Sequence, residues 1–262
     1  MPSTPHTLRA LLAQAVAQHA SDLHLAAGEV PRVRVQGKLR PISGDCATMV
    51  THEALLGMLA KQVNDTQLVQ LQQGTEIDFA LAVPNVGRFR ANAFLHQHGC
   101  GAVMRHIPNQ TPTLAMLDTP AVLPNLLRQV GLLLVTGPTG SGKSSTLAAM
   151  AQHLNTHTQQ HIVTLEDPIE FVHASDQCLI TQREIGAHSN SFAQALRAAL
   201  REDPDVILVG ELRDLETIRL ALTAAETGHL VLASLHTRSA ASTIDRLVDV
   251  FDAQEKSLVR TQ

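Results

Sequence analysis

Apolar and polar residues recur along the first part of the chain in patterns that predict short helices and strands. An amphipathic helix is expected over residues 8–20, where leucine, alanine and valine return at intervals of three and four. A second helix is expected over residues 51–73, ending at Gly74. Period-two alternation predicts strands and turns around these helices: strands at 23–25, 33–36, 77–83, 88–96 and 102–107, with turns at 37–38 and 84–87. These elements predict a small mixed α/β domain over residues 1–108.

The pattern changes after a proline-containing stretch, residues 109–124, which we interpret as a linker between domains. Beyond it, apolar strands alternate with helices. The expected strands are 132–135, 162–165, 206–209 and 230–235, and the expected helices begin near residues 142, 191 and 215. This alternation favours a largely parallel sheet with helices on both faces and ligands at the carboxyl ends of the strands. We therefore predict an α/β core over residues 125–262.

Composition narrows the partners that the chain is expected to have. A formal net charge of −4 and an apolar share of 44% are typical of an ordinary globular protein, and they argue against a nucleic-acid partner held by bulk charge. The three cysteines lie far apart without a C-x-x-C pair, so we expect a reducing cytosol and no zinc site. Residues 1–6 do not resemble a secretory signal, and no apolar run approaches the roughly 18 residues of a membrane span. Any membrane association is expected to be peripheral.

A phosphate-binding motif carries the clearest chemistry. Residues Gly137 to Ser144 match G-x-x-x-x-G-K-[ST] at every fixed position, between the strand at 132–135 and a predicted helix. In such a loop the backbone N–H groups surround phosphate oxygens, Lys143 reaches the terminal phosphates and the Ser144 hydroxyl ligates Mg²⁺. A chance glycine-rich turn is the competing interpretation. The strand and helix around the motif favour a nucleotide site.

Acidic side chains follow two of the predicted strands. Glu166, Asp167 and Glu170 come after the strand at 162–165, where they could hold Mg²⁺ through water or orient an attacking water. A solvated acidic turn is the alternative. Glu211 follows the strand at 206–209, one step beyond the place of an ordinary Walker B aspartate. It could reach the metal through water, or it could serve as a cap or first-turn acid of the helix near residue 215.

Histidines and arginines supply weaker candidates. His229 and His236 bracket the strand at 230–235, and strand periodicity places them on opposite faces, so a shared metal is not expected. Each could equally be one of the structural or surface histidines among the 14 in the chain. Arg88, Arg90 and Arg105 lie on predicted strands of the first domain. They are surface charges unless the protein forms a ring, where they could reach a neighbour's nucleotide.

A set of linked motifs resembles those of the type IV pilus retraction ATPases, the twitching-motility branch of the secretion ATPases. The resemblance covers nearly the whole chain. Two motifs lie in the first domain and the others follow in the family's order: Ala20-Ser-Asp-Leu-His-Leu25 and Gly87-Arg-Phe-Arg-Ala-Asn-Ala-Phe94, then the loop Gly137 to Ser145, the segment 164–170 similar to the Asp box, the segment 201–213 similar to an atypical Walker B, and the segments 224–230 and 234–237 similar to the His box.

The resemblance implies a fold and a set of roles. It implies a PAS-like N-terminal domain and a RecA-like P-loop ATPase core, assembled as a homo-hexameric ring with ATP between neighbouring subunits. Glu170 would be the catalytic base, Glu211 the Walker B acid, His229 and His236 the coupling pair, and Arg90 and Arg105 the fingers acting on the neighbour's ATP. Residues at the nucleotide would be Gly137, Pro138, Thr139, Gly140, Ser141, Gly142, Lys143, Ser144, Ser145, Glu166 and Asp167, with Mg²⁺ held by Ser144 and Glu211, in part through water.

The same resemblance implies Mg²⁺-dependent ATP hydrolysis that drives pilus retraction from the cytoplasmic side of the inner membrane. A platform protein of that membrane would be a partner, and related pilus ATPases are further candidate partners. Family members usually continue into a helical C-terminal region that is expected to be missing here, and residues 253–262 predict a helix with no stop signal. A shortened chain would keep nucleotide binding but put ring assembly and motor activity in question. Arg238 stands where the family more often has a small polar residue.

Three other functions stay open at this point. A pilus assembly or type II secretion ATPase shares the core motifs, although such proteins tend to have a longer N-terminal region and often a four-cysteine zinc element. A nucleotide-binding accessory subunit without turnover is a second possibility, which the acids Glu170 and Glu211 disfavour. A DNA-translocating ring is disfavoured by the net charge of −4.

Overall fold

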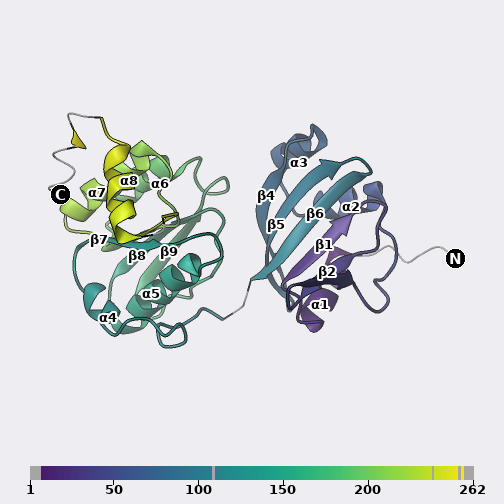
Figure 1. Ribbon diagram of the computed structural model, residues 1–262, viewed down its shortest axis with the longest axis horizontal. Helices are drawn as coiled ribbons and strands as arrows, with labels where there is room; N and C mark the ends of the chain where they lie inside the picture. The colour runs from purple at the N-terminus through teal and green to yellow at the C-terminus, as the bar shows by residue number, and fades with distance from the viewer. Residues whose placement is uncertain (1–6, 108–109, 238, 253–254, 257–262) are drawn as a thin grey trace. The chain divides into compact units, whose positions relative to one another are not determined.

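The computed structural model describes residues 7–107, 110–237, 239–252 and 255–256. Residues 1–6, Arg238 and most of the helix predicted over 253–262 lie outside this description. The chain divides into two compact units, Met1–Asn109 and Gln110–Gln262 (Figure 1). The division falls at the beginning of the predicted linker, and residues 110–124 belong to the second unit.

The first unit is a six-stranded antiparallel sheet whose apolar face is covered by three helices. The strands lie in the order β3-β2-β1-β6-β5-β4. The elements in chain order are α1 (Leu8–Ala17), β1 (Asp22–Ala26), β2 (Arg32–Val35), β3 (Lys38–Pro41), α2 (His52–Leu59), α3 (Asp65–Gln72), β4 (Ile77–Val83), β5 (Gly87–His96) and β6 (Gly99–Ile107). Alternation decides which side chains enter the core: Phe89 and Ala91 are buried, whereas Arg90 and Asn92 lie on the other face of the sheet.

Two expectations for this unit are wrong in detail. The helix predicted over residues 51–73 is two helices, because Asn64 and Gln67 form a capping box that starts a new helix at Asp65. The hairpin turn lies at Gln36–Gly37, whose φ values of 49° and 79° fit a tight two-residue turn. The unpredicted strand β3 follows this turn and pairs with β2.

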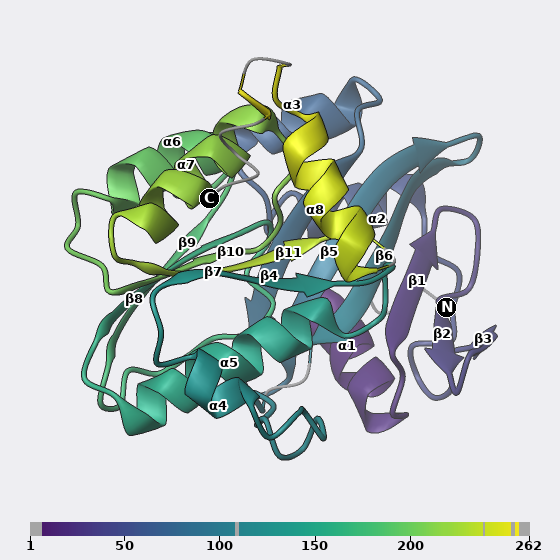
Figure 2. The same ribbon diagram turned by 60° about the vertical axis from the view of Figure 1, so that its left-hand side comes forward.

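The second unit is a five-stranded parallel sheet in the order β7-β11-β10-β8-β9 (Figure 2). Its elements are α4 (Leu123–Leu126), β7 (Gly131–Thr136), α5 (Lys143–His157), β8 (His161–Glu166), β9 (Leu179–Glu184), α6 (Phe192–Ala199), β10 (Val206–Val209), α7 (Leu215–Glu226), β11 (Leu230–Leu235) and α8 (Ala240–Asp249). Strands β10 and β11 are buried along their whole length, as expected for parallel strands with helices on both faces. The predicted α/β fold class is confirmed.

Two cores form on opposite faces of this sheet. Apolar residues of α6, α7 and α8 pack on one face, and those of α4 and α5 pack on the other.

The sequence did not predict α4, β9 or α8. Strand β9 is mostly polar and only partly buried, so its hydrophobic pattern is weak. The packing leaves the carboxyl ends of β7, β11, β10 and β8 along one edge of the sheet, since all four strands run in the same direction.

Candidate active site

The loop from Gly137 to Gly142 joins β7 to α5 and depends on glycine for its shape. Gly140 and Gly142 have φ values of 80° and 94°, in the left-handed region that other residues rarely enter. A Cβ atom at Gly137 would lie 2.5 Å from the Ser141 Oγ atom, so the loop folds back too closely for a side chain there. The glycine spacing that defined the motif therefore has a local steric cause.

The N-terminus of α5 is open to an anion. Gly142 occupies its N-cap position, and no side chain caps the helix. By contrast, α1, α2, α3, α6, α7 and α8 each begin with a polar side chain that accepts a first-turn N–H bond. The first-turn N–H groups of an α-helix have no intrahelical acceptor, and the helix dipole adds positive potential there. A phosphate would satisfy both requirements.

Lys143 is folded into the loop. Its Nζ atom donates hydrogen bonds to the carbonyl oxygens of Gly137 and Pro138, each at 3.0 Å. The same Nζ atom lies 3.4 Å from His236 Nδ1. The loop carbonyls thus hold the ammonium group beside the helix N-terminus, where it adds a full positive charge to the partial charges of the N–H groups.

His236 links the loop to the acid that follows β10. Its Nε2 atom lies 3.3 Å from Glu211 Oε1, while its Nδ1 atom faces Lys143. The second Glu211 oxygen accepts a 2.9 Å hydrogen bond from Arg213 Nε, and Arg213 Nη1 lies 3.8 Å from Asp167 Oδ2. This chain of contacts, the carboxyl-edge network, joins Lys143, His236, Glu211, Arg213 and Asp167. Neighbouring strand ends in the parallel sheet bring its members together.

Sequence reasoning gave Arg213 no role, although it stands two residues after Glu211 in the Walker B segment. That Glu-x-Arg spacing is a signal that could have found it, because both side chains leave the same loop. Ser234 also went unnoticed. Its Oγ atom donates a 2.6 Å hydrogen bond to the Gly210 carbonyl and so fixes the backbone just before Glu211.

Glu166 lies at the end of β8, partly buried. Its Oε1 atom accepts hydrogen bonds from Thr164 Oγ1 at 2.7 Å and Gln182 Nε2 at 3.2 Å, and the backbone N–H of Glu170 also donates to its carboxylate. Burial raises the pKa of Glu166 against the effect of these hydrogen bonds, and the charge of Glu170 raises it further. Glu166 therefore supports the turn that carries Glu170. Glu184, at the end of β9, accepts a 3.0 Å bond from the N–H of Ile169 in the same turn.

Comparison with known proteins identifies the family. Residues 3–258 match the family model described as type II/IV secretion system protein. The chain is 54% identical over 252 residues to the type IV pilus retraction ATPase PilT of Pseudomonas aeruginosa, which covers 96% of this chain and 72% of that relative. This chain belongs to the type II/IV secretion system protein family.

Two further similarities agree with this assignment. The chain is 53% identical to a twitching motility protein of Neisseria gonorrhoeae over 88% of this chain and 61% of the relative. A crystal structure of the pilus retraction motor PilT with bound ADP superposes with a TM-score of 0.91 at 42% identity, covering 97% of this chain and 74% of that one. The predicted retraction branch of this secretion family, and the ATPase class, are confirmed by these relatives.

Three residues with predicted roles lie outside the carboxyl-edge network. They are His229, in the second unit, and Arg90 and Arg105, in the first unit. His229 precedes β11, at the opposite end from His236; seven residues of strand correspond to about 23 Å. Its Nδ1 atom lies 2.9 Å from the Ala224 carbonyl. Arg90 and Arg105 belong to the first unit, where they are directly opposed on β5 and β6. Their suggested action on a neighbouring subunit stays a prediction.

The donor atoms of the loop and the network suit a magnesium nucleotide. Ser144 is exposed in the first turn of α5, and the Glu211 side chain is 23% exposed. Hydroxyl and carboxylate oxygens are the hard ligands that Mg²⁺ prefers, usually together with phosphate and water oxygens. Among the residues that the structure describes, no three His, Cys, Asp or Glu side chains gather to hold a metal by themselves. Within those residues, no helix is long and apolar enough to cross a membrane.

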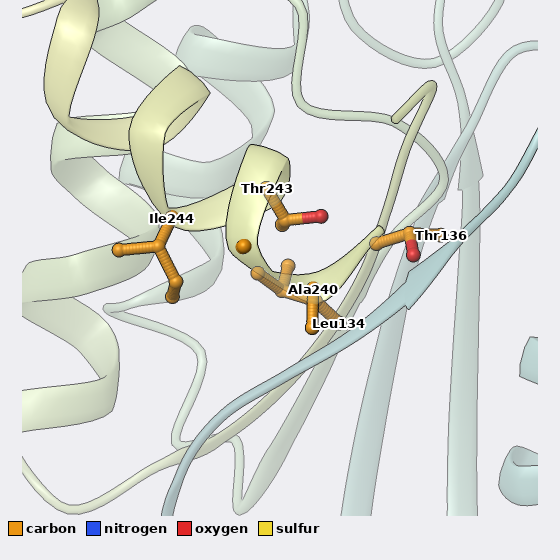
Figure 3. A pocket seen from close by; sticks show the side chains of 6 residues that line it. Leu134, Thr136, Ala240, Thr243 and Ile244 are labelled. Atoms are coloured by element: carbon orange, nitrogen blue, oxygen red, sulfur yellow. The ribbon is translucent and has the colours of Figure 1, made fainter. Parts of the chain in front are cut away.

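A separate pocket lies between β7 and α8 (Figure 3). It is lined by Leu134, Thr136, Ala240, Ala241, Thr243 and Ile244. Thr136 is the last residue before the phosphate-binding loop, but the lining is largely apolar and includes no charged side chain. The pocket is therefore unsuited to phosphate and is distinct from the site at the carboxyl edge.

Proposed function

We propose that this chain hydrolyses ATP with Mg²⁺ to power retraction of a type IV pilus. The convergence of Lys143, His236 and Glu211 beside the uncapped N-terminus of α5 is the observation that carries the proposal. The Lys143 ammonium group and the Glu211 carboxylate lie at the same edge of the sheet, which supports roles in binding phosphate and metal. The similarity to the retraction ATPase PilT supports the choice of pilus retraction among the uses of this chemistry.

In this proposal each residue of the site has a role set by its position. Lys143 and the first-turn N–H groups of α5 bind the phosphates, and Ser144 and Glu211 would hold Mg²⁺, directly or through water. When bound, Mg²⁺ neutralises charge that develops on the phosphate oxygens. Glu170 is the proposed base that orients the attacking water, and the hydrogen bond from its backbone N–H to Glu166 fixes the turn on which it stands.

The contacts of Lys143 suggest how nucleotide binding reaches the rest of the site. A phosphate would compete with the Gly137 and Pro138 carbonyls and with His236 for the same ammonium group. Release of His236 would then change its contact with Glu211, which lies 3.3 Å from the other ring nitrogen. We assign His236 the coupling role on this basis. His229 is proposed to act at a subunit interface.

The similarity to the retraction ATPase PilT extends the proposal to a ring and its surroundings. The chain would assemble as a homo-hexamer, with Arg90 and Arg105 acting on the ATP of the adjacent subunit. It would work at the cytoplasmic face of the inner membrane, against a platform protein at the pilus base, alone or with related pilus ATPases. Because an arginine acting in trans can contribute about 10³-fold or more to phosphoryl transfer, Arg105→Ala should suppress turnover far more than ATP binding.

Steady-state phosphate release by the full chain tests the enzymatic part. Wild-type protein should release phosphate in the presence of Mg²⁺ and ATP, and Lys143→Ala should abolish this release. Glu170→Gln should retain nucleotide binding but lose turnover, which distinguishes a catalytic base from a structural acid. Binding without release in the wild type would favour the accessory subunit instead.

Two further measurements test the motor. Mass in solution with and without a non-hydrolysable ATP analogue should reveal a hexamer, whereas a monomer in both conditions would contradict ring assembly by this chain alone. Expression in a twitching-deficient strain that lacks its own retraction ATPase should restore motility. Restoration by wild type but not by Lys143→Ala would assign the retraction role, and equal failure of both despite ATPase activity would count against it.

A further inference from the structure

Asp22 is an unusual acid for the face of the sheet on which it lies. It begins β1, and its side chain is only 7% exposed. Its Oδ1 atom accepts a 2.9 Å hydrogen bond from Arg105 Nε, and its Oδ2 atom accepts one of 2.8 Å from Ser21 Oγ. Arg34 Nε approaches the same Oδ2 atom to 4.0 Å. An ionised carboxylate so enclosed is costly unless it is paired and hydrogen-bonded, and the contacts with Arg105 and Ser21 supply that compensation.

Arg105 is the opposite case, because its side chain is 71% exposed although one of its nitrogens is anchored. The bond to Asp22 uses the Nε–H, which is one of the five N–H donors of a guanidinium group. The remaining donors belong to the terminal amino groups, the pair suited to bidentate binding of phosphate oxygens. Asp22 thus binds the guanidinium group of Arg105 through Nε and not through the two terminal amino groups.

The registry of the sheet shows why an anchor is needed. Arg34, Asp22, Arg105 and Arg90 occupy facing positions on four adjacent strands, β2, β1, β6 and β5. Opposed residues in an antiparallel pair have side chains about 5 Å apart, so Arg90 and Arg105 repel each other across β5 and β6. The Asp22 charge, between Arg34 and Arg105, offsets this repulsion. Without it, Arg105 would be displaced from its neighbours and would sample more rotamers.

We propose that Asp22 is a positioning residue that holds Arg105 by Nε and presents its terminal amino groups to the phosphates bound by a neighbouring subunit. The inference rests on the proposed function, since it requires that Arg105 act in trans. Asp22 touches no nucleotide in this arrangement. Asp22 orders the long Arg105 side chain before the neighbour's nucleotide binds, and so lowers the conformational entropy that is lost on binding.

Asp22→Asn in the full chain is the direct test, because it keeps the size of the side chain and removes its charge. Turnover should fall about 10-fold to 100-fold, the effect expected of a misplaced catalytic group, while the affinity for nucleotide stays within about 2-fold of wild type. Asp78→Asn is the matched control. Asp78 lies on the same sheet face and accepts a 3.4 Å bond from Asn92. Its strand, β4, does not pair with β6, the strand of Arg105, so its substitution should leave turnover unchanged.

A double-mutant cycle separates positioning from mere structural support. In an Arg105→Ala background, Asp22→Asn should cause no further loss of turnover, because the residue through which it acts is gone. Equal losses in both backgrounds would overturn the inference, and so would wild-type turnover in Asp22→Asn. Circular dichroism checks that each variant is folded. If Asp22→Asn does not fold, Ser21→Ala, which loosens the same carboxylate, replaces it in the cycle with the same criteria.

These experiments distinguish failure of the positioning role of Asp22 from failure of the proposed function. An inactive wild-type chain, or an Arg105→Ala variant with wild-type turnover, would contradict the proposed enzyme or its finger. A strong effect of Arg105→Ala combined with an additive effect of Asp22→Asn would contradict only the positioning role of Asp22.

Discussion

Acid should destabilise the second unit through one buried histidine. His173 lies in the segment that connects β8 to β9, and 9% of its surface is exposed. Its Nδ1 atom is 3.2 Å from Gln152 Oε1 on α5. Burial lowers its pKa from 6.5 to about 4. The folded chain therefore binds this proton less readily than the unfolded chain, and stability is lost as the pH falls below 6.5 toward the folded value.

The magnitude follows from the two pKa values. At 1.36 kcal/mol per pKa unit, the difference between 6.5 and about 4 corresponds to roughly 3 kcal/mol once both states are protonated. Over the narrower range from about pH 7 to about pH 5.5, the unfolded state gains most of a proton while the folded state gains almost none. Linkage then gives a loss of about 1 kcal/mol in the free energy of unfolding.

Urea unfolding of the full chain, followed by far-ultraviolet circular dichroism at both pH values, measures this loss. The chain has two units, so the transition of the second unit is the one to compare. His173→Gln keeps a polar side chain that does not titrate, and the pH-dependent loss should shrink by about 1 kcal/mol in this variant. An identical pH dependence in wild type and variant would refute the assignment of the effect to His173, whatever the absolute stability of the variant.

The loop and its supports give two further predictions. Gly137→Ala should weaken binding of a fluorescent ATP analogue about 10-fold, because its φ of 154° disfavours other residues and its Cβ atom would meet Ser141 Oγ at 2.5 Å. Gly140→Ala meets open space and carries only the strain of its φ of 80°, so it should lose less; equal losses would argue against a contribution from the Ser141 contact. Asn155, fully buried, donates to the Ala174 carbonyl at 2.8 Å and accepts from the Asp176 N–H at 3.0 Å. Asn155→Ala should cost about 1–3 kcal/mol in urea unfolding, and a cost near zero would mean that these bonds contribute nothing.

The nucleotide loop was predictable because its chemistry is local. Its glycines, Lys143 and Ser144 stand at fixed spacing, and both the strand before it and the helix after it carry clear apolar patterns. The central strands β10 and β11 were predictable for the same reason, because they are buried along their whole length and every residue except Ser234 is apolar. Where sequence neighbours decide the structure, the sequence alone was sufficient.

The rest of the site depends on contacts between segments that are distant in sequence. Arg213 gains its position from Glu211 two residues away and from Asp167 on another strand end, and only the parallel registry brings these together. Glu184, on β9, accepts a hydrogen bond from the turn at Ile169. Strand β9 was not predicted because most of its residues are polar. The split of the predicted helix at Asn64 is a different failure, in which a local capping box outweighed a continuous apolar pattern.

The charges at the carboxyl edge explain why one chain is expected to need a neighbour. Among the residues that the structure describes, this edge carries the cations Lys143 and Arg213 and the acids Glu166, Asp167, Glu170, Glu184 and Glu211. Burial raises the pKa of Glu166. A triphosphate adds several negative charges, which Mg²⁺ offsets only in part. Arginines supplied in trans would balance the remainder at the moment of phosphoryl transfer, when the charge on the oxygens is greatest. If Arg105 acts in trans as proposed, Arg105 with its anchor Asp22 on one subunit and the acids of the carboxyl edge on the next would contribute to one shared site.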